Sequence, residues 1–130
     1  MSHKYLLDAS ALLALLQDEA GSEIVAHYLP FCAISSVNLA EVASVLNKVG
    51  MPENEMDELF NEMDLDILPF NKELAIATGG IRRLTQKKGL SLGDRACLVT
   101  AKHSNRIALT ADRVWLDYQK DIDLEIKLIR

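Results

Sequence analysis

The chain has 130 residues, of which 49% are hydrophobic and 25% are charged, and this length suits a single domain with its own core. No apolar run approaches the roughly 20 residues that span a bilayer, and Asp8 interrupts the first apolar run too early for a secretory signal. We therefore expect a cytoplasmic protein without membrane segments.

The cysteines and histidines do not indicate a disulfide or a zinc site. Cys32 and Cys97 have apolar neighbours and no companion at metal-ligand spacing, so we expect both to be small core residues. His3, His27 and His103 also lack the paired spacing of zinc ligands.

The N-terminal stretch predicts a buried strand that ends in an acid. Residues 5–7 are three large apolar residues in a row, and Ser10 opens a run of helix formers that reaches residue 16. Asp8 is therefore expected in a sharp strand-to-helix turn.

The later elements continue this alternation. Apolar spacing and stop signals predict helices over residues 22–29, 37–49 and 52–63, and strands over residues 32–34, 65–69, 105–110 and 124–129, the last as an edge strand. A long helix from Asn71 toward Gly89 is broken or bent at Gly79-Gly80, either as a kink or to allow close packing.

Two further helices complete the pattern. Ser91 and Asp94 fit a capping box that opens a helix through Ala101, and a short helix carries Val114 and Trp115. Strands that alternate with helices predict one α/β domain over residues 1–130, with a mainly parallel central sheet flanked by helices.

Four acids occupy positions where a parallel sheet gathers its ligands. Asp8 and Asp112 follow strands, and Glu41 and Asp94 stand in the first turns of helices. Because ligand sites lie at the carboxyl ends of such strands, we expect the four side chains to meet. Oxygen-only ligands suit Mg²⁺ or Mn²⁺, which would lower the pKa of a bound water and favour attack on a phosphodiester.

Some of these positions fit a second, purely structural role. Asp94 could simply complete a helix cap, but its helical neighbours Cys97 and Leu98 are apolar, so its stripe should face the interior, where a carboxylate needs a cation or donors. We favour the ligand role. Ser10 and Thr110, each two residues from an acid, could support a metal site or equally cap turns.

The charge distribution bears on a nucleic-acid partner. A net charge of −5 argues against such a partner at first sight. Without the four candidate ligands the net charge would be −1, so with cations bound the surface would be nearly neutral. Arg82, Arg83, Lys87 and Lys88 concentrate positive charge near one helix end, where the helix dipole and an RNA contact explain them equally well.

Four segments carry a resemblance to a known family. With LDASAL at 7–12, NLAEV at 38–42, LSLGDR at 90–95 and LTADR at 109–113, the chain resembles the PIN-domain ribonucleases and, among them, the VapC toxins of toxin–antitoxin pairs. The resemblance covers essentially the full length, with the four segments in order.

The resemblance implies a function and partners. It implies a metal-dependent endoribonuclease acting on RNA with Mg²⁺ or Mn²⁺, a homodimer, and inhibition by a small VapB-like antitoxin. It places Asp8, Glu41, Asp94 and Asp112 as ligands, although the nearby Asp117 leaves the fourth position open.

Arg95 and Arg113 stand next to two of these acids. Both are candidates for phosphate or antitoxin carboxylate contacts, and as exposed helix residues they could equally have no special role.

Two alternatives belong to other classes. A receiver-like signalling module also gathers acids around Mg²⁺, but it requires an acid after the central strand and a Lys after the last, and neither is present here. A PIN-like interaction protein without activity is the other alternative, and the intact acids weigh against it.

Overall fold

The computed structural model describes residues 4–130, and its centre is a five-stranded parallel sheet. The strand order is β3-β2-β1-β4-β5, and all four neighbouring pairs are parallel. The strands are β1 (Tyr5–Leu7), β2 (Cys32–Ser35), β3 (Asp66–Leu68), β4 (Ile107–Thr110) and β5 (Ile126–Leu128). The predicted α/β class and parallel sheet are confirmed, with β5 at an edge.

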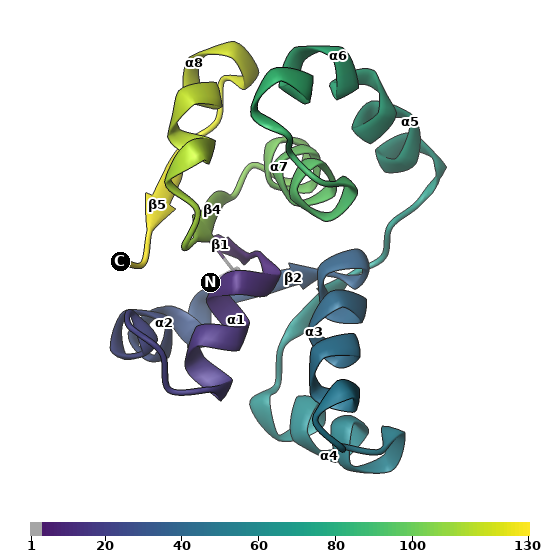
Figure 1. The fold of residues 1–130 in the computed structure, drawn as a ribbon, viewed down its shortest axis with the longest axis vertical. Coiled ribbons are helices and arrows are strands. Elements are labelled where there is room, and N and C mark those ends of the chain that lie inside the picture. The colour runs from purple at the N-terminus through teal and green to yellow at the C-terminus, as the bar shows by residue number, and fades with distance from the viewer. Residues whose placement is uncertain (1–3) are drawn as a thin grey trace.

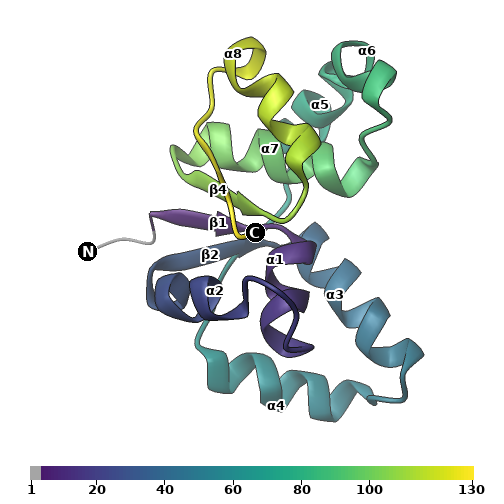
Figure 2. The same cartoon turned by 60° about the vertical axis from the view of Figure 1, so that its left-hand side comes forward.

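Helices cover both faces of this sheet (Figures 1 and 2). α1, α2, α3 and α4 lie on one side, and α5, α6, α7 and α8 lie on the other. Their bounds are α1 (Ala9–Leu16), α2 (Ser22–Tyr28), α3 (Ser36–Lys48), α4 (Glu53–Met63), α5 (Lys72–Gly80), α6 (Arg82–Thr85), α7 (Leu92–Ser104) and α8 (Gln119–Ile122), with short 3₁₀ segments η1 (Leu29–Phe31), η2 (Gln86–Lys88) and η3 (Arg113–Tyr118). No helix in residues 4–130 is both long and apolar enough to cross a membrane.

The alternation of side chains along β1 divides the core in two. Leu7 faces the cluster built with α1, α2, α3 and α4, whereas Leu6 faces the cluster built with α7 and η3. Both side chains are fully buried, as expected for a central parallel strand covered on two faces. Cys32 and Cys97 are buried and free, which confirms their prediction as core residues.

The segment predicted as one helix from residue 71 to residue 89 is divided into α5, α6 and η2. The helix breaks at Ile81, directly after Gly79 and Gly80, and Gly89 ends η2 with a φ of +70°. A Cβ on Gly79 or Gly80 would meet no described atom within 4 Å. The glycine pair therefore interrupts the helix and does not serve close backbone packing.

Short polar side chains start the helices at the carboxyl edge of the sheet. Asp8 caps α1, Ser35 caps α3, Ser91 caps α7 and Asp112 caps η3. A capping side chain accepts a hydrogen bond from an amide that has no partner within the helix. The four caps therefore fix the helix starts that carry the candidate site.

Candidate active site

Asp8 lies directly after β1 and is the most buried of the four predicted acids, at 4% exposed. Its Oδ1 accepts hydrogen bonds from Ser10 Oγ at 2.7 Å and from the Ala11 amide at 2.8 Å. Its Oδ2 accepts from Thr110 Oγ1, at the end of β4, at 2.6 Å. The strand end, the helix start and the neighbouring strand thus hold one carboxylate between them.

Burial raises the pKa of Asp8 from 3.8 to about 6. The hydrogen bonds from Thr110, Ser10 and Ala11 act in the opposite direction, and the negative charge of Asp94 adds to the rise. Desolvation is therefore only partly compensated by the donors present. A nearby cation would favour the charged form and lower this pKa.

Glu41 lies in the second turn of α3, where a buried amide holds it. Asn38 Nδ2 donates to Glu41 Oε1 at 2.7 Å and to the Gly93 carbonyl at 3.1 Å, which links α3 to α7. The Glu41 carboxylate lies so close to Gly93 that a Cβ there would overlap it. The Glu41 carboxylate therefore lies against the residue that directly precedes Asp94 in the chain.

Asp94 forms the predicted capping box of α7. Its Oδ2 accepts from the Ser91 amide at 3.0 Å, and Ser91 Oγ accepts from the Asp94 amide at 3.1 Å. The carboxylate is half-buried and its ligand role stays a prediction.

The buried thiol of Cys97 is influenced by the charges of three of the acids. Burial is the main cause that raises its pKa well above 9.0, and the charges of Asp8, Asp94 and Glu41 raise it further. The charges of Asp8, Asp94 and Glu41 therefore all act on one buried position of α7.

Asp112, rather than Asp117, is connected to this group. The Asp112 amide donates to Thr110 Oγ1 at 3.1 Å, and Thr110 in turn donates to Asp8. Asp112 Oδ1 caps η3 by accepting from the Val114 amide at 3.0 Å. Asp117 is exposed and forms an ion pair with Lys88 at 3.5 Å.

The four accessory residues differ in their surroundings. Ser10 and Thr110 contact Asp8 directly, and Ser10 Oγ also accepts from the Ala111 amide at 3.0 Å. The expectation that Arg95 is exposed is wrong: it is 7% exposed and donates to the Thr78 carbonyl at 3.1 Å, because α7 packs against α5. Arg113 is exposed and donates to the Arg130 carbonyl at 3.2 Å.

The ligand atoms that the four acids offer are of the chemical type that a hard divalent cation binds. Carboxylate oxygens are the ligands that Mg²⁺ and Mn²⁺ prefer, and the buried Asp8 lacks full compensation for its charge. Within residues 4–130, no three acids, histidines or cysteines form a cluster that could hold a metal as the side chains stand. Asp94 and Asp112 now accept from cap amides, which a bound cation would have to displace or share.

The histidines do not join the acids. His103 Nδ1 lies 3.0 Å from the Val99 carbonyl on its own helix, and His27 packs edge-on against Tyr28. His3 lies outside the described residues. An oxygen-only set of ligands therefore remains the chemistry that the site offers.

Sequence reasoning missed the supporting roles of Asn38 and Gly93. Asn38 is 1% exposed, and both of its amide hydrogens are used by Glu41 and Gly93. The sequence did contain a signal for the contact between Asn38 and Glu41, since residues three apart on a helix are neighbours. The proximity of Gly93 to Glu41 joins positions 52 residues apart, so local pattern could not reveal it.

A family model described as "PIN domain" matches residues 5–121. No curated protein matches the sequence significantly.

Solved structures match the fold over nearly the whole chain. VapBC2 from Rickettsia felis, bound to a DNA fragment from its promoter, is 21% identical, with 95% of this chain and 97% of that chain covered and a TM-score of 0.70. DNA-bound VapBC from Salmonella typhimurium is 19% identical over 100% of both chains, with a TM-score of 0.69. VapBC-1 from nontypeable Haemophilus influenzae is 18% identical over 96% and 97%, with a TM-score of 0.65.

Proposed function

The chain belongs to the PIN domain family, and on this premise we propose that it is an endoribonuclease that requires Mg²⁺ or Mn²⁺. The observation that carries the proposal is the buried Asp8 carboxylate, whose pKa is raised to about 6 by burial and further by the charge of Asp94. The Asp112 amide shares the Thr110 hydroxyl with Asp8, and Asn38 links Glu41 to the residue before Asp94. Strongly shifted acids in such places are candidates for functional groups. A divalent cation would relieve the repulsion among them.

Asp8, Glu41, Asp94 and Asp112 are the residues that would hold the cation. When bound, it would supply Lewis acidity to a phosphodiester and lower the pKa of an attacking water. Ser10 and Thr110 orient the two oxygens of Asp8. Asn38 orients Glu41 through its amide, so the acids keep their positions before substrate arrives.

The two alternatives make different predictions. A receiver-like module lacks support because residues 5–121 match the PIN domain. The missing acid after residues 66–68 does not count against it, because β3 is an edge strand and the central strand, β1, is followed by Asp8. An inactive PIN-like protein would keep the fold and show no cleavage with any divalent cation. The activity assay below separates the last case from an active nuclease.

The test compares cleavage of single-stranded RNA by wild type and by acid-to-amide variants in Mg²⁺. Asp8→Asn, Glu41→Gln, Asp94→Asn and Asp112→Asn should each lower the rate by at least a hundredfold while the far-UV spectrum is unchanged. Asp117→Asn is the matched control, since Asp117 pairs with Lys88 outside the hydrogen-bonded group. Equal rates for Asp8→Asn and wild type would contradict the proposal.

We further propose that the protein is the toxin of a toxin–antitoxin pair and acts as a homodimer in the cytoplasm. The matched structures described as VapBC complexes support a VapB-like antitoxin partner. A groove of about 760 Å³ between α3 and α4, with Leu39, Met56 and Phe60 among its apolar lining residues and Glu53 and Asp57 among its acids, offers a surface for such a partner.

Each part of this proposal has its own measurement. Purification from the native host should retain a small partner protein, and light scattering should give the mass of two chains for the isolated protein. A monomer at all concentrations would contradict the dimer. Growth arrest on expression, relieved by the partner or by Asp8→Asn, would be expected of a toxin.

A further inference from the structure

One exposed segment of the molecule concentrates positive charge. α6 and η2 carry Arg82, Arg83, Lys87 and Lys88, and residues 82–88 contain no acid. All four cations are exposed. We call residues 82–88 the basic segment.

Structural pairing explains little of this charge. Lys88 forms an ion pair with Asp117 at 3.5 Å, but both side chains are about half exposed, where such pairs contribute ~0–1 kcal/mol. In the part of the chain that the structure describes, Arg82, Arg83 and Lys87 form no ion pair. A helix dipole is a weak alternative because α6 has only 4 residues and η2 only 3.

Two contacts place the basic segment against the C-terminal end of η3. Lys88 pairs with Asp117 on η3, and Tyr118 of η3 donates to the Thr85 carbonyl at 3.5 Å. η3 starts at its cap Asp112, so these contacts lie five and six residues along the chain from one of the four acids. On the other side, Asp94 follows Lys88 by six positions, so the chain between them spans at most ~22 Å.

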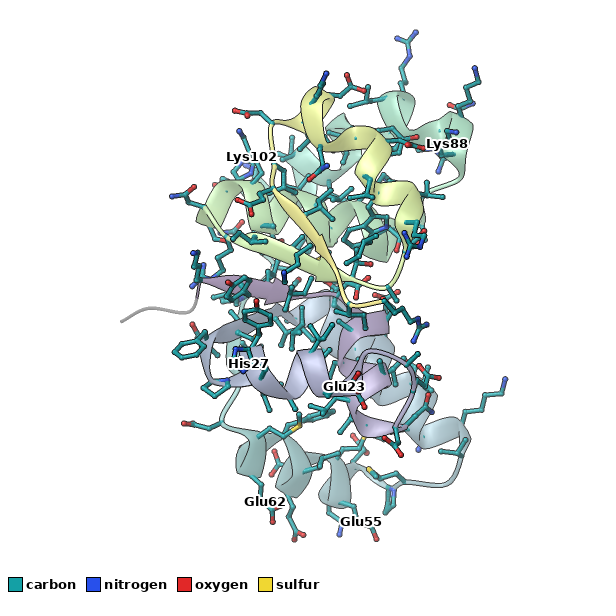
Figure 3. The ribbon with its side chains drawn as sticks, turned by 90° about the vertical axis from the view of Figure 1, so that its left-hand side faces the viewer. Glu23, His27, Glu55, Glu62, Lys88 and Lys102 are labelled. Atoms are coloured by element: carbon teal, nitrogen blue, oxygen red, sulfur yellow. The ribbon has the colours of Figure 1, made fainter. Side chains whose placement is uncertain are left out.

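The opposite end of the molecule is acidic. Figure 3 shows Lys88 at the end away from Glu55 and Glu62. α4 carries no Lys or Arg, and its acids are Glu53, Glu55, Asp57, Glu58 and Glu62. The field of the protein therefore repels a polyanion from α4 and attracts it to the basic segment, despite the net charge of −5.

We propose that the basic segment binds the phosphates of single-stranded RNA and leads the strand to the four acids. This inference rests on the proposed ribonuclease function. Three exposed cations that form no ion pair within residues 4–130 provide what a negatively charged substrate needs, because the four acids alone would repel it. The contacts are to the backbone, so they increase affinity without selecting a sequence.

RNA binding is tested without cleavage, in EDTA, by fluorescence anisotropy. The probe is a labelled single-stranded RNA of about 30 nucleotides, longer than the ~4–16 nucleotides that single-strand binders cover. Removing three phosphate contacts in Arg82→Gln/Arg83→Gln/Lys87→Gln should weaken binding roughly tenfold or more, and should reduce the slope of log K against log salt by about 2.

The matched control removes three exposed lysines elsewhere, as Lys4→Gln/Lys48→Gln/Lys72→Gln. It has the same net charge as the first triple variant and should keep nearly the wild-type affinity and slope. Equal loss in both variants would overturn the proposal, because only net charge would then matter. Wild-type RNA affinity in the basic-segment variant would also overturn it. If that variant kept its RNA affinity but no longer bound an acidic protein partner, the segment would belong to the partner instead.

Cleavage in Mg²⁺ separates this inference from the proposed function. The basic-segment variant should raise KM for long RNA and leave kcat unchanged, while kcat/KM for a trinucleotide stays at the wild-type value. A loss of kcat on both substrates would overturn the surface assignment. If wild type binds RNA through this segment and cleaves none, the surface stands and the ribonuclease proposal fails.

Discussion

Among single residues, Asp8 is the one whose charge is most constrained by the fold. Its carboxylate has three donors, yet its pKa is still raised to about 6, because burial outweighs the hydrogen bonds. The sequence predicted an acid at a strand end and could not show this balance, which depends on Thr110, 102 residues away. The same Thr110 hydroxyl also accepts a hydrogen bond from the Asp112 amide, and Asp112 as the fourth ligand stays a prediction.

The raised pKa predicts how stability depends on pH in the absence of metal. The folded state holds the Asp8 proton more tightly than the unfolded chain does, so the contribution of Asp8 to stability is fully present below pH 4 and is lost as pH rises through about 6. A shift of about 2 units corresponds to roughly 3 kcal/mol.

Asp8→Asn should therefore be more stable than wild type at pH 8 in EDTA, with the difference shrinking toward pH 4. Urea unfolding across this pH range measures it, and Mg²⁺ at pH 8 should stabilise wild type more than the variant. A difference between the two proteins that does not change with pH would refute the assignment of the shift to Asp8.

Gly93 gives a second prediction for a single residue. A Cβ at this position would overlap the Glu41 carboxylate, so Gly93→Ala should displace Glu41 from its hydrogen bond with Asn38. The expected effect is a 10–100-fold higher Mg²⁺ concentration for half-maximal cleavage, as for the loss of other groups that support metal ligands. Unchanged Mg²⁺ dependence would show that Glu41 does not need its present position.

Among the elements, local pattern predicted most strands and helix starts, but packing decided the details. The capping box of α7 was predicted from Ser91 and Asp94 because both partners are close in sequence. The burial of Arg95 was not, because α7 is enclosed by α5 as well as the sheet, and a charged residue gives no local sign of burial. The break at Ile81 follows from the glycine pair that precedes it.

That break leads to a prediction for α5. A Cβ on Gly79 meets no described atom within 4 Å, and Ala is favoured over Gly in a helix by about 1 kcal/mol, so Gly79→Ala should stabilise the protein by up to that amount. Cleavage should be unchanged, because α5 carries none of the four acids. Thermal unfolding measures the gain; a loss of stability would mean that the flexibility of this junction is itself required.

At the scale of the whole molecule, the alternation of elements predicted a parallel sheet but not its strand order. Apolar runs do not identify their neighbours, so the placement of β1 between β2 and β4 became visible only in the structure. That placement brings the cap of α1 beside the end of β4, and it explains why Thr110 reaches Asp8 although the two are 102 residues apart. The opposite charges of α4 and the basic segment also appear only at this scale.

The central claim is that the gathered acids hold a cation needed to cleave RNA. Its most direct test is the cleavage rate of single-stranded RNA as Mg²⁺ is titrated into EDTA-treated protein. We predict no cleavage without cation, a saturable rise with Mg²⁺ for wild type and Asp117→Asn, and no rise for Asp8→Asn. Full activity in EDTA, or the same Mg²⁺ response in Asp8→Asn as in wild type, would contradict the claim.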